Sequence, residues 1–283
     1  ALACFSSLNA NALTETKVKK TETQTAAPNV YWTDGYGRVS YTTNSIISPV
    51  VKIALKEFAG DMKAVTGFDA KEKSGAPIQI YQLDQLTNKE FSAVEKLGAP
   101  LHLIITAKDA FYIGTRKGKL IVIGSNARGT AYAIMKLSEL AGVSPLAAWN
   151  DLQPAQRKSL YTPVDQQWIE VPRIEFRGLA LNNSQWMKPQ NYSRIARLML
   201  RLRANTLWQV DGKHGAAYNK AVVESFDICV AENYKVTEFV GKKHKKKHRK
   251  NIENVKLVCS DAQMEMSNLS PGLLLEMLNS KDY

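Results

Sequence analysis

Hydrophobic and polar positions in the first half of the chain follow two different periods. Apolar residues recur every three or four positions between Pro49 and Gly67, which predicts an amphipathic helix that starts at the proline and stops at the glycine. Short apolar runs between turn residues predict strands. Strands are expected at 77–83, 110–115 and 119–123, and a second helix at 130–141. Strands interleaved with helices predict an α/β domain with a mixed sheet over residues 29–165.

The second half changes to a longer repeat of strand, helix and strand. Strands are expected at 174–181, 206–210 and 236–240, with helices at 192–202 and 220–233 between them. The first of these helices is apolar on one face and carries Arg194, Arg197 and Arg201 on the other. A βαβαβ order predicts parallel strands with right-handed crossovers. We therefore expect the first units of a (β/α)8 TIM-type barrel over residues 166–240, and an incomplete barrel, because the alternation ends after Val240.

Residues 1–28 have the pattern of a leader followed by a linker. The first twelve residues are short, apolar and end in Ala10-Asn11-Ala12, as at the cleavage site of a secretory signal. The polar, threonine-rich residues that follow are typical of a linker. Nowhere does the chain approach the roughly 18 apolar residues that a membrane span needs. We expect a secreted or periplasmic protein without a membrane-spanning helix.

The positive charge of the chain is concentrated in one tract. The net charge is +12, but residues 242–250 hold seven Lys and Arg, and without them it would be +5. Such a tract can bind a polyanion, but it has no interleaved aromatic residues and no nucleic-acid motif. We expect no nucleic-acid partner and interpret residues 241–283 as a basic tract with a diverged tail, either a disordered charged segment or a reading-frame error.

The three cysteines, Cys4, Cys229 and Cys259, show no spacing typical of a metal site. We expect buried or free thiols, with a Cys229–Cys259 disulfide as the alternative in an exported chain. The sequence predicts no metal site and no cofactor. His102, between two leucines, is expected to be an ordinary strand residue.

A polar loop follows the first predicted barrel strand and contains Asn182, Asn183 and Trp186. In a barrel of this kind the loops after the strands form the catalytic face. Amides hydrogen-bond sugar hydroxyls and an indole stacks on a sugar ring, so this loop suits a carbohydrate; the alternative is an Asn-rich turn with a core tryptophan. Asp211 and His214 follow the second strand and are interpreted as a polar loop pair, because glycoside hydrolysis needs two carboxylates.

A glycine-bounded turn, residues 124–129, connects a predicted strand to a predicted helix. It lacks the Lys-Ser/Thr pair of a phosphate-binding loop, which excludes that class of nucleotide site. Free backbone N–H groups and Arg128 could hold a carboxylate there. The alternative is a plain turn with an exposed arginine.

Two motifs resemble glycoside hydrolase family 115, the xylan α-glucuronidase family. The first is the Arg128-Gly129-Thr130 turn followed by Gly142-Val-Ser-Pro145 and Trp149; the family aspartate of this turn is Asn126 here. The second begins at Arg177-Gly178 and includes Asn182, Trp186 and Asn205-Thr-Leu-Trp208. The two motifs occur in the family's order and spacing, and the resemblance covers roughly residues 30–235.

The resemblance implies an α/β accessory domain packed on a (β/α)8 catalytic barrel and an inverting release of (4-O-methyl)glucuronic acid from glucuronoxylan. The partner would then be a uronic-acid-bearing carbohydrate; the oligomeric state is left open. The residues expected to bind substrate are Asn126, Arg128, Asn182, Asn183, Trp186, Asn205 and Trp208. An acidic run of the family is replaced by Asn183-Ser184-Gln185, so no catalytic residue can be assigned. We expect a truncated or degenerate copy with little activity; the alternative is a non-catalytic carbohydrate-binding or scaffold protein.

Overall fold

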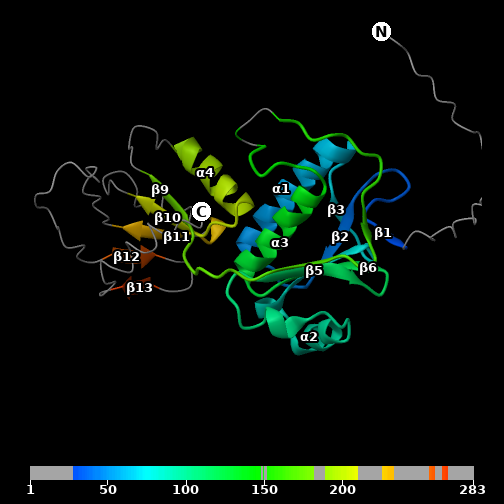
Figure 1. Ribbon diagram of the computed structural model, residues 1–283, viewed down its shortest axis with the longest axis horizontal. Helices are drawn as coiled ribbons and strands as arrows, with labels where there is room; N and C mark the ends of the chain where they lie inside the picture. Colours follow the sequence, from blue (N-terminus) through cyan, green and yellow to red (C-terminus); the bar gives the residue numbers. More distant parts are fainter. Residues whose placement is uncertain are drawn as a thin grey trace, which may run out of the picture.

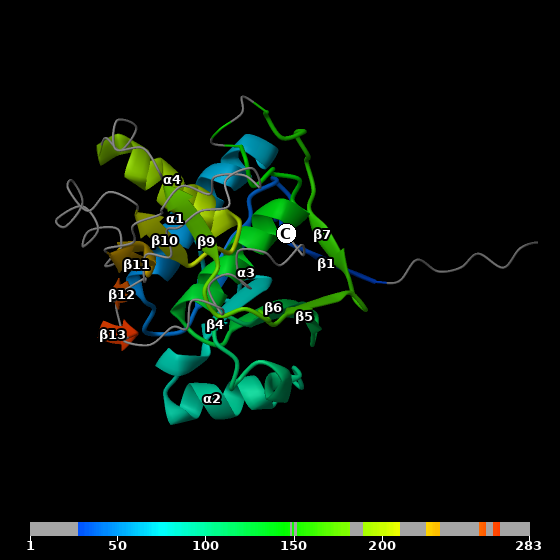
Figure 2. The same ribbon diagram turned by 60° about the vertical axis from the view of Figure 1, so that its left-hand side comes forward.

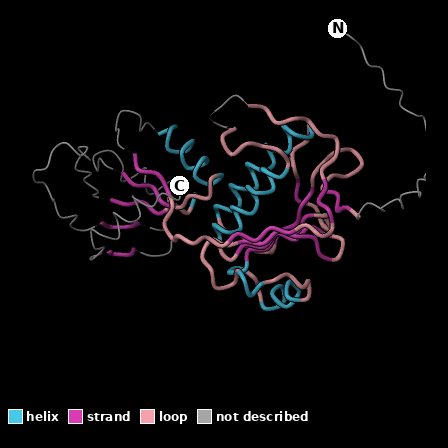
Figure 3. Tube along the Cα trace, viewed as in Figure 1, coloured by secondary structure: helices cyan, strands magenta, loops and turns pink. Residues whose placement is uncertain are grey.

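The computed structural model describes residues 28–147, 149, 152–181, 189–209, 225–232, 255–258 and 263–266. Within them the strands form two main groups, coloured magenta in Figure 3, and a separate two-stranded ribbon. The ribbon pairs β1 (Asn29–Tyr31) with β7 (Tyr161–Pro163) in antiparallel register. Since helices and strands alternate along the described chain, the expected α/β class is confirmed.

The first group is a six-stranded mixed sheet. Its strands, in spatial order, are β3 (Lys71–Glu72), β2 (Ser40–Thr43), β4 (Ile78–Gln82), β6 (Lys119–Gly124), β5 (Phe111–Arg116) and β8 (Gln167–Glu170). The first four run parallel to one another, and β5 is antiparallel to both of its neighbours. Since β8 lies in this sheet, the sheet extends slightly beyond the expected boundary at residue 165.

Helices cover both faces of this sheet (Figure 1). α1 (Pro49–Thr66) and α3 (Ala127–Leu140) pack on one face, and α2 (Asn88–Glu95) lies on the other with the short 3₁₀ turns η1 (Leu83–Gln85) and η2 (Leu101–Leu103). Neighbouring strand residues alternate between the two cores, as Ile113 and Tyr112 do. Burial on both faces explains why β5 and β6 are continuous apolar runs rather than alternating ones.

Local signals set most helix ends, with two corrections. α1 starts at Pro49 and ends at Gly67, whose left-handed φ of 86° any other residue would adopt only with strain. α3 starts at Ala127, three residues earlier than expected, because the Asn126 side chain accepts a hydrogen bond from the backbone N–H of Gly129 and caps the helix. His102 is not a strand residue: it lies exposed in the 3₁₀ turn η2.

The second group of strands starts as expected for a barrel and then departs from it. β9 (Gly178–Leu181), β10 (Thr206–Gln209) and β11 (Cys229–Glu232) are parallel, and α4 (Pro189–Arg201) connects the first two. β12 (Val255–Val258) and β13 (Gln263–Met266) continue the sheet in antiparallel register.

The helix expected at 220–233 is wrong at its end. Residues 229–232 are strand β11, because this short apolar run pairs with β10, with Val230 opposite Leu207. The strand expected at 236–240 lies outside the described residues.

Replacing Gly129 with alanine is expected to destabilise the protein, although alanine normally favours helices. A Cβ at this position would collide with the carbonyl oxygen of Ala110, so α3 would have to move away from β5. Overpacking of this kind costs about 1–3 kcal/mol. Gly60 in α1 is the matched control, because a Cβ there meets nothing within 4 Å. Urea unfolding followed by circular dichroism measures both variants. Gly60→Ala should raise the free energy of unfolding by roughly 0.5–1 kcal/mol. Equal changes in the unfolding free energy of the two variants would contradict the close packing of Gly129 against the Ala110 carbonyl.

Candidate functional site

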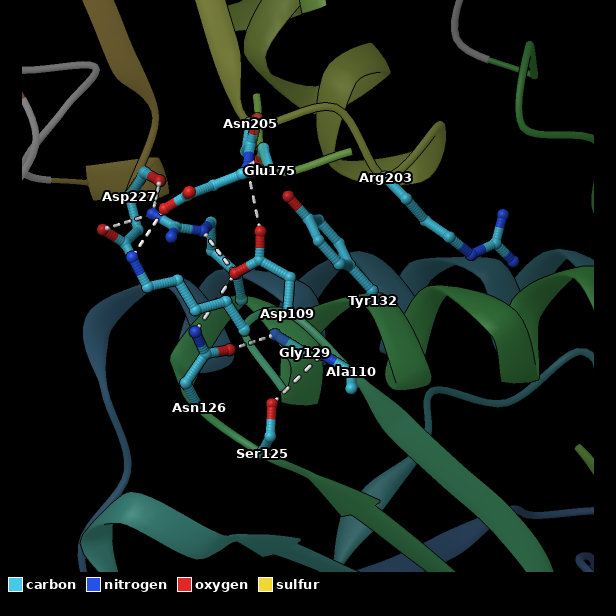
Figure 4. Close-up of polar contacts among 12 residues, drawn as sticks. Asp109, Ala110, Ser125, Asn126, Gly129, Tyr132, Glu175, Arg203, Asn205 and Asp227 are labelled. Atoms are coloured by element: carbon cyan, nitrogen blue, oxygen red, sulfur yellow. Dashed lines mark hydrogen bonds and ion pairs between the residues drawn. The ribbon is translucent and has the colours of Figure 1, made fainter. Parts of the chain in front are cut away.

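A buried carboxylate, Asp109, lies where the first sheet meets the second (Figure 4). It precedes β5 in a left-handed turn with φ 59°, and its side chain is 1% exposed. Arg128 Nε and Asn126 Nδ2 donate to Asp109 Oδ1 at 2.8 and 3.1 Å. Arg177 Nη2 and Asn205 Nδ2 donate to Oδ2 at 3.0 and 2.9 Å. We call these five residues the Asp109 cluster.

The electrostatics of the cluster favour its charged form. Burial opposes ionisation of Asp109, but the charges of Arg128 and Arg177 and the hydrogen bonds from Asn126 and Arg128 outweigh it and lower its pKa. Burial likewise opposes the charge of Arg128, whereas Asp109 and Asp227 raise its pKa. Arg128 Nη1 also donates to the Asp227 carbonyl at 3.0 Å and lies 3.4 Å from its carboxylate. The cluster is thus a charge-assisted network in which one carboxylate lies between two guanidiniums, and Asp227 supplies a second negative charge beside Arg128.

The second sheet contributes to this cluster through the amino-terminal ends of its parallel strands. Arg177 directly precedes β9, Asn205 directly precedes β10, and Asp227 lies two residues before β11. Backbone bonds link these ends: Asn205 N donates to Arg177 O and Cys229 N donates to Asn205 O, both at 2.7 Å. The catalytic face of a barrel lies at the opposite, carboxyl ends of the strands, whereas the amino-terminal end serves stability.

α4 lies beside the helices of the first sheet (Figure 2). A second set of ion pairs attaches it to them. Arg201, whose side chain is 7% exposed, donates to both carboxylate oxygens of Asp61 in α1 at 2.9 Å each and to Glu57 at 3.2 Å. Burial opposes the charge of Arg201, but the hydrogen bond and charge of Asp61 and the charge of Glu57 raise its pKa. Arg203, just after α4, pairs with Glu139 in α3 at 2.8 Å.

Three of the residues expected to bind substrate therefore come together, but in the joint between the two sheets. Asn126, Arg128 and Asn205 all contact Asp109, and their contacts are intramolecular. Substrate binding by them stays a prediction. Trp208 lies in β10 opposite Ala180 and Ala231, which the backbone pairing defines.

The remaining expected residues fall outside the described part of the chain. These are Asn182, Asn183 and Trp186 of the loop after β9, together with Asp211 and His214. The Asp109 cluster lies at the other, amino-terminal end of β9, where Arg177 contacts Asp109. The role of the loop also stays a prediction.

Sequence reasoning missed two carboxylates. Asp109 precedes a strand, as many ordinary loop residues do. Only its contacts with residues distant in the sequence show that it is a buried, paired carboxylate. Glu232 ends β11, so it lies at the carboxyl edge of the parallel strands. The incorrect helix at 220–233 hid it, and the apolar run from Ile228 to Ala231 before an acidic residue was the available signal.

A solvent-exposed cation–π pair joins the connector after α3 to α4. The guanidinium of Arg194 lies 4.8 Å from the ring centroid of Trp149, and Trp149 is 45% exposed. The two residues are 45 positions apart in the sequence, and no local pattern relates them.

Three further findings concern the described part of the chain. In the described part of the chain, no group of three or more His, Cys, Asp or Glu side chains is placed to hold a metal ion. No helix there is long and apolar enough to cross a membrane. Cys229 is disulfide-bonded, so the expectation of a buried or free thiol is wrong for this residue.

Comparisons with known proteins identify the fold. No protein-family model and no curated protein matches the chain. A solved family GH115 4-O-methyl-α-glucuronidase with specificity for decorated arabinogalactans is 26% identical with a TM-score of 0.59, over 68% of this chain and 28% of that one. A chitobiase from Flavobacterium johnsoniae is 14% identical with a TM-score of 0.45, over 72% of this chain and 32% of that one. The chain has a glycoside-hydrolase-like fold and spans 28% of the length of the α-glucuronidase.

Proposed function

We propose that the chain provides the accessory domain and the first barrel strands of an α-glucuronidase-type glycoside hydrolase. Its substrate would be a polysaccharide such as glucuronoxylan that carries (4-O-methyl)glucuronic acid side chains. The similarity to the α-glucuronidase, at 26% identity over 68% of this chain, is the observation that carries the proposal. The Asp109 cluster supports the proposal. The cluster joins the accessory sheet to the amino-terminal ends of the barrel strands, which serve stability in such barrels. The carboxyl ends, where catalysis occurs in this fold, are separate from the cluster.

The proposed chemistry is an inverting hydrolysis. One carboxylic acid protonates the leaving oxygen, and a carboxylate about 6.5–9.5 Å away activates a water on the opposite face of the sugar. Among the described ends of β9, β10 and β11, Glu232 is the one carboxylate, beside Leu181 and Gln209. The acids of the family loop are Asn183, Ser184 and Gln185 in this chain. This residue set favours binding of the sugar over its hydrolysis.

We propose export to the periplasm or the cell exterior. The apolar leader-like residues at the start of the sequence and the disulfide at Cys229 support this location, because disulfides persist in oxidising compartments.

The 283-residue chain is expected to release little or no glucuronic acid from glucuronoxylan oligosaccharides, because two catalytic carboxyl groups are needed and the loop acids are replaced. Product should be followed by NMR, which also reports the anomer released first; turnover at the roughly 1–1000 s⁻¹ of ordinary enzymes would contradict this expectation. Chitobiose serves as the comparison substrate. Hydrolysis or binding of chitobiose, without any response to uronic acids, would overturn the proposed substrate class.

A second candidate is a non-catalytic carbohydrate-binding or scaffold protein. The replacement of the loop acids by Asn183, Ser184 and Gln185 favours it. Saturable binding of uronic-acid oligosaccharides without product release would select it over the hydrolase.

A further inference from the structure

We propose that Tyr31 and Tyr161 form a secondary binding platform for the neutral main chain of a polysaccharide, separate from the barrel strands. The platform rests on the proposed function, since it specifies the part of glucuronoxylan that carries no charge. Its basis is a pair of phenol rings with centroids 5.7 Å apart, on residues that are 53% and 54% exposed.

The two tyrosines are direct neighbours across the ribbon of β1 and β7, where Tyr31 lies opposite Tyr161. The next pair along the ribbon is joined by a backbone hydrogen bond from Trp32 N to Leu160 O. Hydrogen-bonded and non-hydrogen-bonded pairs alternate in an antiparallel ladder. The tyrosines are therefore a non-hydrogen-bonded pair, in which the side chains come closest to each other.

The opposite face of the ribbon is fixed to the core. Val30 and Thr162 are buried between exposed positions, as the alternation of side chains along a strand requires. Trp32 is 2% exposed, and its indole Nε1 donates to the Thr162 hydroxyl at 2.8 Å. The tyrosines thus stand on a rigid support, so little conformational freedom is lost when a ligand binds to them.

The two rings are accessible to a ligand. Their planes are tilted by 55° instead of being stacked on each other, and about half of each residue is open to solvent. Within the described part of the chain, neither phenol hydroxyl donates or accepts a hydrogen bond. The pair therefore presents aromatic surface and two hydroxyl groups that the packing of the fold does not use.

The chemistry of this face matches a neutral sugar chain. The face consists of Asn29, Tyr31, Tyr161 and Pro163, all of them uncharged in a chain of net charge +12. Tyrosine offers an apolar ring to the C–H face of a pyranose and a hydroxyl to its oxygen atoms. The Asn29 amide adds a donor and an acceptor. A uronic acid or another polyanion would instead need cations on this face.

A second copy of the chain fits this face less well than a sugar does. A stable protein interface buries about 800 Å² on each partner. Four side chains, two of them on half-exposed tyrosines, present much less area than this. We therefore assign the face to a polysaccharide and treat self-association as an outcome of the test.

The ribbon lies apart from the barrel strands. Figures 1 and 2 show β1 on the side of the six-stranded sheet away from β9, β10 and β11. An extended polysaccharide bound at the ribbon therefore leaves the barrel strands free. A second binding site of this kind raises the local concentration of a long substrate at the protein.

Calorimetric titration of the full chain with an unbranched, neutral xylo-oligosaccharide tests the platform. Tyr31→Ala and Tyr161→Ala are each expected to weaken binding about threefold to tenfold, as expected for the loss of one aromatic contact. Tyr31→Phe should keep most of the affinity, because the ring remains. Tyr36→Ala is the matched control, since it removes a tyrosine that is 87% exposed in the turn after β1 and does not belong to the pair. Circular dichroism verifies that each variant is folded.

Loss of affinity in both alanine variants of the pair, with Tyr36→Ala unchanged, supports the platform. Unchanged binding in both, an equal loss in Tyr36→Ala, or no binding by the folded wild-type chain overturns it. Analytical ultracentrifugation tests the alternative occupant: a dimer that Tyr31→Ala abolishes would assign the face to a second copy and overturn the platform.

The same variants separate the platform from the proposed function. Binding of free glucuronic acid and its release from glucuronoxylan oligosaccharides decide the proposed substrate class. Binding of the free acid should be the same in the wild type and in the tyrosine variants, since the platform carries no cation. A loss of free-acid binding in Tyr31→Ala and Tyr161→Ala equal to the loss for the neutral chain would overturn the assignment of the platform to the uncharged main chain.

Discussion

Replacing Asp109 with asparagine is expected to lower the free energy of unfolding by about 3–5 kcal/mol, the range measured when one partner of a buried ion pair is removed. The asparagine keeps the shape of the side chain but removes the negative charge between Arg128 and Arg177. Arg177 would then lose this carboxylate partner, and Arg128 would keep only the longer pair with Asp227. Urea unfolding followed by circular dichroism, extrapolated linearly to water, measures the change. Asp69→Asn is the control, because the pair between Asp69 and Lys63 is exposed and 3.7 Å long; its loss should cost less than about 1 kcal/mol.

The Asp109 variant should also change how stability depends on pH. The folded-state pKa of Asp109 is lowered, so its contribution is complete above the usual pKa of about 3.9 and is lost as the pH falls through the lower folded value. The difference in unfolding free energy between wild type and Asp109→Asn should therefore shrink below about pH 4. A difference that stays constant to lower pH would contradict the ion-pair assignment.

Replacing Arg201 with alanine is expected to cost a similar amount, about 3–5 kcal/mol. Arg201 donates to both oxygens of Asp61 and to one oxygen of Glu57. Its removal takes these bonds from the largely buried carboxylate of Asp61 and leaves Glu57 with the pair to Arg197. Lysine at this position should recover only part of the loss, because it cannot form the bidentate pair. Urea titration gives the magnitude.

The neighbouring arginine provides the control for this result. Arg197 lies on the same helix and contacts the same Glu57, but its side chain is 44% exposed. Its replacement by alanine should change the unfolding free energy by less than about 1 kcal/mol. Equal losses in the two variants would show that the charge of α4, rather than the buried geometry, stabilises the joint.

The sequence predicts those parts of the fold whose signals are local. Pro49 and Gly67 mark the ends of α1, and the apolar runs of β4, β5 and β6 are long enough to identify strands. The alternation of apolar and arginine faces predicts α4, and the structure explains it: Met199 packs against the strands, while Arg201 pairs with α1.

Side-chain contacts and strand pairings between residues distant in the sequence could not be predicted. Asp109 contacts Arg177 and Asn205, which are 68 and 96 residues away, and no local pattern indicates such a contact. β11 is a strand because β10 lies beside it, whereas the isolated residues also fit a helix. Arg128 and Asn205 each donate to Asp109, which belongs to neither motif, so the motifs alone do not indicate that these two residues lie close together.

The charged joint has a consequence for the inheritance of the six-stranded sheet and its helices. A recombination event that moved residues 29–170 to another protein would separate Asp61 from Arg201 and Asp109 from Arg177. The transplanted domain would carry acidic groups suited to guanidiniums that its new host does not supply. We therefore expect residues 29–170 to be inherited only together with the strands β9 to β11 that follow them. The motif at Arg128 and the motif at Asn205 should then be retained or lost together.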